Sequence, residues 1–507
     1  MTDTETVKIP RGQVRRVAII GGGASGAVTL DAFIKERAFD EIHLFERRSV
    51  AGGVWVLDEH IDQKQIVGRV APGAKPEVLD PPLPIPVLQE GQSLVKTPSS
   101  QFRFRETPSY EGIRTNIPEV FMTYSDRPRW SHLDQPEVDT LTTRDVVQSY
   151  VADYINKNEG DKTHEIFYNT TVEKLTKKGL KYELDIRTEV PGSDFETWKK
   201  STYDAVVVAT GHYSIPKIPD VPGLQKVYER FPEKLEHAKF YRNLDKYHNK
   251  KVLLIGSRAS GVDLGHQISK VSSQVTVSTR SLERSILQPT PSSLFQIKPI
   301  IERYSVVEDR ITAHFSDGTV LEDPDYIIYG TGYYFSYPFL KQQYPDFVAQ
   351  PSNEYLPFSF QHTFYVHDPL IATVGVPIDS ISFRAFEYQA VLISRFYSGK
   401  AELPSLQDQL RWCLARVIKV SGERPDSIER GVHTIGIVEA VSYRDELTAL
   451  GGGVSPIGSG KAFPVFGEAE TTEIIKFVLL KGKEVPEEIQ QRAKSFAPVP
   501  VNVSISV

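Results

Sequence analysis

The chain has almost no cysteine, and this scarcity excludes several kinds of protein. Cys413 is the single cysteine among 507 residues. One thiol forms neither a disulfide framework nor a C-x-x-C redox pair nor a cysteine-rich zinc site. The 12 histidines show no H-E-x-x-H or other ligand spacing, so the sequence predicts no metal. Sparing use of cysteine also favours a reducing compartment such as the cytosol.

An excess of positive charge and a long apolar run are missing as well. The formal net charge is −6, which leaves no electrostatic footprint for nucleic acid. Residues Met1 to Glu5 carry acids and no apolar run, unlike a secretory signal. No stretch approaches the roughly 18 apolar residues that a membrane span needs. We therefore expect a cytoplasmic protein with no membrane span and no nucleic-acid partner.

The strongest positive signal lies near the N-terminus. Val17 to Ile20 predicts a buried parallel strand. The next six residues hold the G-x-G-x-x-G pattern of a dinucleotide fold: Gly21, Gly22, Gly23, Ala24, Ser25 and Gly26. The first glycine of the pattern permits a tight turn, the second lets a pyrophosphate approach, and the third lets the helix pack on the strand. The helix N-terminus then offers free N–H groups to the phosphates.

An acidic residue and a second glycine pair follow this turn. The apolar strand Ile42 to Phe45 ends at Glu46, about 20 residues after the last glycine, where the pattern places an acceptor for a ribose diol. Gly52-Gly53-Val54-Trp55 comes next, and its glycines permit close backbone approach to a cofactor. The alternative for this segment is a simple turn with a packed tryptophan.

The stretch from residue 71 to residue 108 is rich in proline, which disfavours regular helix and central strand. Its apolar residues are too many for a free linker. We expect an extended excursion on the surface or on a neighbouring subunit. The second case would make the protein a homo-oligomer. A proline-rich ligand for a recognition domain is the alternative.

Thr115 and Asn116 follow, just before Pro118. The Asn116 amide offers donors and acceptors in a segment that we expect to be partly buried. An asparagine near a proline is also a common turn residue. The residues alone leave both roles open.

The opening pattern begins again in the middle of the chain. The apolar strand Lys251 to Ile255 leads into Gly256, Ser260 and Gly261, with Arg258 at the position of the middle glycine. The next strand, from Val275, ends at Arg280 instead of an acid. A guanidinium suits a 2′-phosphate, so the sequence predicts NADPH at this second turn. The alternative for Arg280 is a solvated charge at a strand end.

The order of these elements predicts the architecture. Apolar strands from Ala205 and from Asp325 each close on a tight turn, so the second nucleotide unit is an insertion within the first. We expect an α/β fold of two nested Rossmann-like dinucleotide-binding domains in three layers. An acid-ended and an arginine-ended dinucleotide fold in one chain suggest a flavoprotein reduced by NADPH. The predicted boundaries are 1–215 and 329–507 for the FAD-binding domain and 216–328 for the inserted NADPH-binding domain. The glycines from Gly451 to Gly460 follow no apolar strand and predict a loop.

Several ordered motifs resemble those of the flavin-containing monooxygenases. Phe231, His237 and Tyr241 match the family pattern F-x-G-x-x-x-H-x-x-x-[YF], with Glu233 in place of the glycine. Thr115-Asn116 matches the family's T-N-x-P segment, and Gly52-Gly53-Val54-Trp55 matches G-G-x-W. Thr331-Gly332-Tyr333 and Phe339 match the stretch T-G-Y…F-P-F-L. The resemblance runs from Val17 to Leu403 and is greatest to the soluble fungal branch.

The resemblance implies a reaction of the N,N-dimethylaniline monooxygenase type. NADPH reduces FAD, and the reduced flavin takes up O2 as a C4a-hydroperoxide. A soft nucleophile of a small molecule, sulfur or nitrogen, then attacks the distal oxygen. Asn116 would be the catalytic residue, as a hydrogen-bond partner of the hydroperoxide, while His237 and Tyr241 would hold the linker between the domains.

Three alternatives remain from the sequence. A Baeyer–Villiger monooxygenase shares both nucleotide folds, but its motif ends in tryptophan where Tyr241 stands. A disulfide reductase shares the cofactors, but a single cysteine cannot form its redox pair. A flavin-binding protein without turnover is suggested only by Glu233 and Arg258, the two departures from the family pattern.

Overall fold

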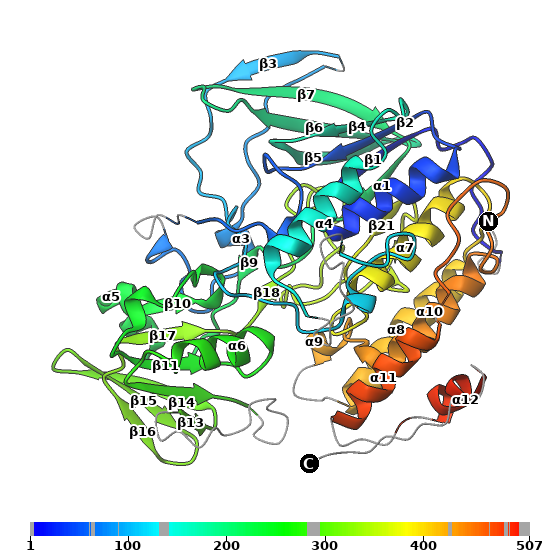
Figure 1. Cartoon of the computed structure of the whole chain (residues 1–507). Helices are drawn as coiled ribbons and strands as arrows, with labels where there is room; N and C mark the ends of the chain where they lie inside the picture. Colours follow the sequence, from blue (N-terminus) through cyan, green and yellow to red (C-terminus); the bar gives the residue numbers. More distant parts are fainter. Residues whose placement is uncertain are drawn as a thin grey trace.

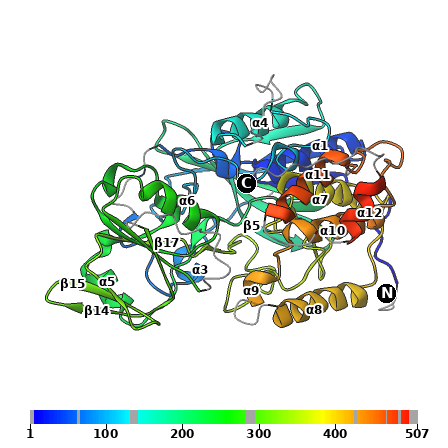
Figure 2. The ribbon, with the colours of Figure 1, turned by 60° about the horizontal axis from the view of Figure 1, so that its bottom comes forward.

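The structure is a computed structural model. It describes residues 5–59, 61, 66–89, 91–130, 141–280, 295–423, 428–465, 467–480, 485 and 487–495. Figure 1 shows two parts of unequal size, and Figure 2 shows the same division from another side. The larger part holds both ends of the described chain, and the smaller part, drawn in green, comes from its middle.

A seven-stranded sheet forms the core of the larger part. Its order is β19-β20-β21-β8-β1-β2-β4. The central strand β1 (Arg16–Ile20) lies parallel to β2 (Glu41–Phe45) and β8 (Ala205–Val208). The outer strands are β4 (His164–Phe167), β21 (Ile371–Thr373), β20 (Phe364–Tyr365) and β19 (Ser359–Phe360). The side chains of β8 are all buried, as expected for an apolar parallel strand between two layers.

Helices cover this sheet. The first helix, α1 (Ala24–Glu36), packs against α4 (Arg144–Asn156) and the long buried helix α7 (Ser382–Tyr397). The C-terminal helices are α8 (Leu406–Glu423), α9 (Ile428–Gly431), α10 (Gly436–Leu450), α11 (Glu468–Leu480) and α12 (Glu487–Ser495). Figure 1 shows α10 and α11 side by side next to α7.

A five-stranded parallel sheet forms the core of the smaller part. Its order is β10 (Leu235–His237), β17 (Tyr326–Tyr329), β11 (Lys251–Ile255), β12 (Gln274–Ser278) and β13 (Phe295–Lys298). The helices α5 (Leu224–Arg230) and α6 (Ala259–Ile268) accompany it. An antiparallel sheet of β14 (Ile301–Val307), β15 (Arg310–Phe315) and β16 (Val320–Glu322) adjoins it.

The chain passes between the two parts through a short strand pair. β9 (Ile215–Pro216) lies antiparallel to β18 (Tyr333–Tyr334). The larger sheet is mixed, since β20 and β19 form antiparallel pairs beside five parallel strands. Those parallel strands and the parallel sheet of the smaller part confirm the predicted α/β class with two Rossmann-like units. The domain boundaries at 215/216 and 328/329 stay a prediction.

The proline-rich stretch is less irregular than expected. It contains one helical turn, α3 (Pro76–Leu79), and one strand, β3 (Ser93–Lys96). Pro76 is tolerated because it stands at the first helical position, where its missing N–H leaves no bond unmade. β3 contains no proline and forms the edge of an antiparallel sheet with β7 (Glu196–Tyr203), β6 (Lys181–Glu189) and β5 (Thr170–Lys178).

Short 3-10 turns complete the described elements: η1 (Gly53–Trp55), η2 (Glu119–Phe121), η3 (Pro232–Lys234), η4 (Ala238–Phe240) and η5 (Asp245–Tyr247). The residues from Gly451 to Gly460 form a loop, as the sequence predicts. None of the helices in the described ranges combines the length and the apolar character needed to traverse a lipid bilayer.

Candidate cofactor-binding and active site

The first glycine turn joins β1 to α1 in a backbone arrangement that requires glycine. Gly21 has a φ of +115°, and a Cβ there would lie 2.4 Å from the Ala209 carbonyl oxygen. A Cβ on Gly26 would lie 1.9 Å from the Gly21 carbonyl oxygen, so the helix rests directly on the turn. Ser25 fastens the turn to the neighbouring strand end, since its hydroxyl donates to the Ala209 carbonyl at 3.1 Å.

The middle of the turn is covered by the predicted Gly52–Trp55 segment. A Cβ on Gly53 would come within 2.9 Å of the Gly23 Cα, and Gly53 has a φ of +57°. The two backbones therefore touch, which only glycine at Gly53 permits. Val54 is exposed, and Trp55 is partly buried against the core.

Glu46 lies at the carboxyl end of β2 and is buried. Its carboxylate accepts hydrogen bonds from the Gly22 N–H at 2.6 Å and the Arg48 N–H at 2.8 Å. The sequence predicts a ribose acceptor here, and two backbone donors already hold the group in place. Each carboxylate oxygen has a second lone pair, so acceptor capacity remains for a diol.

A cavity of about 130 Å³ opens beside this carboxylate. It lies at the carboxyl ends of β1, β2 and β8, where an open α/β sheet binds its ligand. The residues lining it include Gly21, Glu46, Arg47, Thr210 and His212. A glycine cradle, an acceptor and a cavity at one sheet edge fit the adenosine and pyrophosphate parts of FAD.

His212 also lines this cavity, and none of the sequence motifs predicts it. Its side chain is 8% exposed, and neither ring nitrogen has a hydrogen-bond partner among the described residues. Burial lowers the pKa of the imidazole to about 4, so the ring is neutral. The signal in the sequence was weak: a polar residue two places after Thr210, just past a strand end that faces the glycine turn.

The second glycine turn joins β11 to α6 and has the same backbone form. Gly256 has a φ of +111°, and a Cβ there would lie 2.5 Å from the Gly330 carbonyl oxygen. A Cβ on Gly261 would lie 2.0 Å from the Gly256 carbonyl oxygen. Ser260 is exposed in the first turn of α6. The two turns are thus alike at their outer glycines.

The second turn differs at its middle position and at the next strand end. Arg258 is the N-cap residue of α6 with an extended backbone (φ −93°, ψ −169°), which any residue adopts. Its guanidinium lies 3.4 Å from the Asp379 carboxylate. Arg280 follows β12 and is exposed. The turn and this strand end are joined by the Ser257 and Thr279 hydroxyls, 2.7 Å apart.

The loop from Gly375 to Ile381 touches both turns. A Cβ on Gly375 would lie 3.2 Å from the Ser25 Cβ in the first turn. Four residues later, Asp379 meets Arg258 of the second turn. The structure therefore brings together the two glycine turns that the sequence predicts separately.

Asn116 lies on a segment fastened to the first turn. Its neighbour Thr115 is buried and exchanges hydrogen bonds with Thr142, at 2.9 Å through the backbone N–H and 3.0 Å through the Oγ1. Further along, the Tyr124 hydroxyl donates to the Ala24 carbonyl at 2.5 Å. The segment is partly buried, as expected, but the Asn116 side chain is exposed. The amide is therefore open to a ligand.

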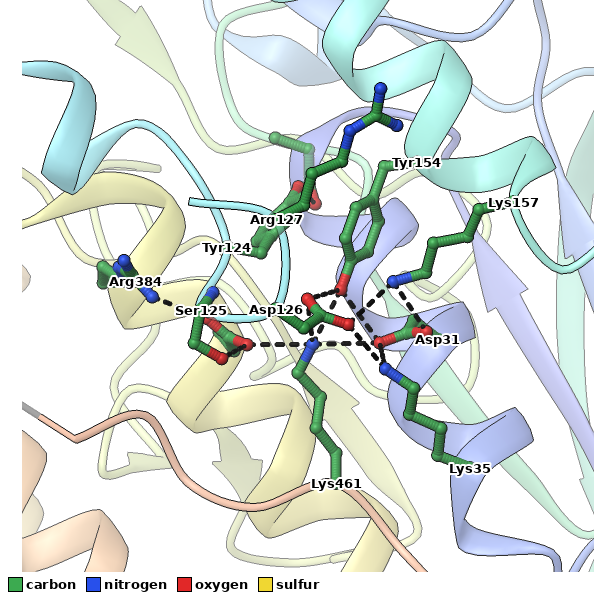
Figure 3. A network of polar contacts seen from close by, with 12 residues as sticks. Asp31, Lys35, Tyr124, Ser125, Asp126, Arg127, Tyr154, Lys157, Arg384 and Lys461 are labelled. Atoms are coloured by element: carbon green, nitrogen blue, oxygen red, sulfur yellow. Dashed lines mark hydrogen bonds and ion pairs between the residues drawn. The ribbon is translucent and has the colours of Figure 1, made fainter. Parts of the chain in front are cut away.

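A buried charge network holds the far end of this segment (Figure 3). Ser125 donates to Glu387 of α7 through its N–H at 2.8 Å and its hydroxyl at 2.5 Å. Lys461 lies within 2.9 Å of Asp31, 2.8 Å of Asp126 and 2.9 Å of Glu387. Burial alone would lower the pKa of the Lys461 ammonium, but these carboxylates hold it above its ordinary value. The network ties α1, α7 and the C-terminal segment to the Asn116 segment.

His237 is the last residue of β10 in the second sheet and bonds to the segment between β17 and β18. Its Nδ1 accepts from the Lys239 N–H at 3.1 Å, so Nε2 carries the proton and donates to the Gly332 carbonyl at 3.0 Å. Burial lowers the pKa of this imidazole to about 3. The Tyr241 hydroxyl donates to Gln267 of α6 at 3.2 Å. Both side chains are buried and hydrogen-bonded, and their role in holding the linker between the domains stays a prediction.

Within the described ranges, no three His, Cys, Asp or Glu side chains gather closely enough to hold a metal ion. The polar residues around the two turns are suited to nucleotides instead.

Comparison with known proteins gives the same family as the motifs. The family described as "Flavin-binding monooxygenase-like" matches residues 105–290 and 294–453. The flavin-containing monooxygenase ustF2 of Aspergillus flavus is 27% identical over 436 residues, covering 78% of this chain and 84% of that protein. The flavin-containing monooxygenase iboF of Amanita muscaria is 28% identical over 440 residues, covering 77% and 80%.

A solved structure shares the fold. The S-allyl-L-cysteine S-oxygenase from Allium sativum superposes with a TM-score of 0.70 at 22% identity, over 95% of this chain and 98% of that one. The predicted family is confirmed, and with it a flavin cofactor. Since the family match spans more than half of its residues, the chain belongs to the flavin-binding monooxygenase-like family.

Proposed function

We propose that the protein is an NADPH-dependent FAD monooxygenase that transfers one oxygen atom from O2 to a sulfur or nitrogen atom of a small molecule. The observation that supports this best is the loop from Gly375 to Ile381, which contacts Ser25 of the first turn and Arg258 of the second. Two nucleotides bound at these turns would have their reactive ends directed to one shared region. Hydride transfer requires such an approach of two rings.

The principal residues of the site have proposed roles. The glycines from Gly21 to Gly26 and the Glu46 carboxylate would hold FAD, and Arg280 would hold the 2′-phosphate of NADPH. Bound FAD supplies the redox chemistry, since it accepts hydride and, once reduced, activates O2. The protein holds the rings in place and keeps water from the reacting oxygen. Asn116 would donate its amide N–H to that oxygen.

Sulfur is the first candidate for the accepting atom. The Allium sativum protein with this fold is an S-allyl-L-cysteine S-oxygenase, and sulfur is a soft nucleophile that needs no acid–base pair for its attack. A Baeyer–Villiger reaction on ketones is the second candidate. It is disfavoured because Tyr241 stands where the motif of the Baeyer–Villiger monooxygenases ends in tryptophan. Incubation of the FAD-loaded protein with NADPH and a thiol, a sulfide, an amine or a ketone, followed by product analysis, tests the choice. NADPH oxidation without any oxygenated product would contradict the proposal.

Asn116 gives the sharpest test of the mechanism. We expect Asn116→Ala to leave anaerobic flavin reduction nearly unchanged, because hydride transfer needs only ring alignment. Product formation should fall by about 10²-fold, the usual cost of one preorganised donor at a developing charge. NADPH consumption should then release hydrogen peroxide. The measurement is the ratio of product and hydrogen peroxide to NADPH consumed.

Glu111→Ala is the matched control, since Glu111 is an exposed residue of the same segment. It should keep the wild-type ratio. An Asn116→Ala protein with full product yield would show that Asn116 is only a turn residue.

A further inference from the structure

Arg258 is a departure from the glycine pattern that the proposed function leaves unexplained. It stands where the pattern places its middle glycine, next to the free N–H groups of α6. Those groups and the helix dipole would receive the pyrophosphate of the coenzyme. A long cationic side chain at this position is therefore next to the place where two negative charges arrive.

The backbone shows why an arginine fits there. The φ of −93° and ψ of −169° are ordinary extended values, so the turn does not need glycine at this point. The first turn is different, because Gly23 lies against the backbone of Gly53 and a side chain on it would point into that contact. The second turn has a side chain in the same place, and the space in front of it is open to solvent: Arg258 is 54% exposed.

The guanidinium has a partner in the other part of the molecule. Asp379 lies 3.4 Å away on the loop that begins at Gly375 and touches Ser25 of the first turn. Both side chains of the pair are 54% exposed. Water screens such a pair, so it contributes little free energy and is easily exchanged. A pyrophosphate carries more charge than a carboxylate and offers several oxygens to the planar guanidinium.

We propose that Arg258 exchanges partners: it pairs with Asp379 in the absence of coenzyme and with the coenzyme pyrophosphate when NADPH or NADP⁺ is bound. Asp379 is then a competitor that weakens coenzyme binding and takes the guanidinium back when NADP⁺ leaves. This inference rests on the proposed use of NADPH at the second turn. It assigns Arg258 to the pyrophosphate, which NADPH and NADH share, and leaves the 2′-phosphate to Arg280.

The two members of the pair therefore have opposite expected effects. Removal of Arg258 removes a ligand of the pyrophosphate, whereas removal of the Asp379 charge frees that ligand. If the pair were only a static link between the two parts, loss of either member would have the same effect. A double-mutant cycle separates the two cases.

The experiment measures the Kd of NADP⁺ for the FAD-loaded protein by titration calorimetry. The variants are Arg258→Gly, Asp379→Asn and the double variant. We expect Arg258→Gly to weaken binding about 10-fold, as for loss of one charge-assisted contact. Asp379→Asn should tighten binding about 3-fold, and the double variant should match Arg258→Gly. NAD⁺ should show the same fold-changes.

Asp309→Asn is the control for removal of an exposed carboxylate, because Asp309 forms another exposed pair, with Arg230, in the part of the molecule that holds Arg258. It should leave the Kd unchanged. The exchange is overturned if Asp379→Asn weakens binding, or if its effect persists in the double variant. Wild-type protein that binds FAD but no NADP⁺ would contradict the proposed function itself, an outcome distinct from these.

Discussion

The two strand–turn–helix units share one backbone design and differ in what surrounds them. In α1, 11 of 13 residues are buried, beneath α4, α7 and the C-terminal segment. In α6 only four of ten are buried: Gly261, Leu264, Gly265 and Ile268. A ligand at the start of α1 would therefore be more enclosed by the molecule than a ligand at the start of α6. This difference suits a cofactor that stays bound at the first turn and a coenzyme that is exchanged at the second in every cycle.

The charges around the two units differ in the same way. The first has a buried acceptor, Glu46, and a buried ammonium, Lys461, that neutralises carboxylates on α1 and α7. The second has two exposed arginines, Arg258 and Arg280. Buried groups of this kind are held by a rigid environment, whereas exposed side chains can follow a ligand that comes and goes.

The largest expected effect comes from adding one methyl group to the last glycine of each turn. The Cβ of Gly26→Ala would lie 1.9 Å from a backbone oxygen, and that of Gly261→Ala would lie 2.0 Å from one. Backbone yields less than a side chain, so the cost should exceed the roughly 1–3 kcal/mol of ordinary overpacking. We expect Gly26→Ala to lose bound FAD, and Gly261→Ala to stay yellow and lose NADP⁺ binding.

Flavin absorbance per protein after desalting and the Kd of NADP⁺ check this pair. Gly422→Ala is the control, because a Cβ there meets no atom within 4 Å. A Gly26→Ala protein with a full complement of FAD would remove the main reason for assigning FAD to the first turn.

The next effect concerns the buried charge that only the first unit has. Lys461→Met would leave Asp31 and Glu387 buried with fewer counter-charges. Loss of one member of a buried ionic group costs about 3–5 kcal/mol of unfolding free energy. Lys35→Met is the control, since Lys35 contacts the same Asp31 at 3.0 Å but is 34% exposed, and should cost about 1 kcal/mol or less. Urea unfolding, monitored through the release of flavin, measures the unfolding free energy of both variants.

The same network predicts how stability changes with pH. Burial alone would raise the pKa of Asp31, but Lys461, Lys157 and Lys35 lower it from 3.8 to about 2. A lowered carboxyl pKa adds stability that is fully present above about pH 4 and is lost as the pH falls towards 2. In Lys461→Met the folded-state pKa of Asp31 should rise towards or above its ordinary value, so this acid-dependent loss of stability should become smaller. An unchanged acid transition would show that Lys461 does not set the pKa of Asp31.

The smallest effect concerns which coenzyme the second unit selects. Arg280→Ala should weaken the binding of NADPH by roughly 1.5–3 kcal/mol, or about 10–150-fold, and leave the binding of NADH nearly unchanged. The ratio of kcat/KM for NADPH to that for NADH reports this directly. The exposed Arg310 of β15 provides a control substitution to alanine. A ratio that stays constant in Arg280→Ala would mean that another residue contacts the 2′-phosphate.

Much of the fold was predictable because its signals are local. Val17 to Ile20 is apolar enough for a buried strand, and the spacing of Gly21, Gly23 and Gly26 depends on backbone sterics within a few residues. The proline-rich stretch was predicted less well. Pro76 begins a helical turn, and the proline-free residues from Ser93 to Lys96 form the edge strand of a sheet whose other strands lie far away in the sequence. Composition describes an average over the stretch and misses such short elements.

Local sequence thus defines the two turns, the acid and the arginine that follow them, and the family motifs, because each depends on neighbours along the chain. Tertiary structure alone decides that Asp379 meets Arg258, that Lys461 meets Asp31, and that His212 faces the cavity beside Glu46. Those contacts join residues far apart in the chain. Their formation depends on how the buried faces of sheets and helices pack, and no local pattern of residues encodes which distant side chains that packing brings together.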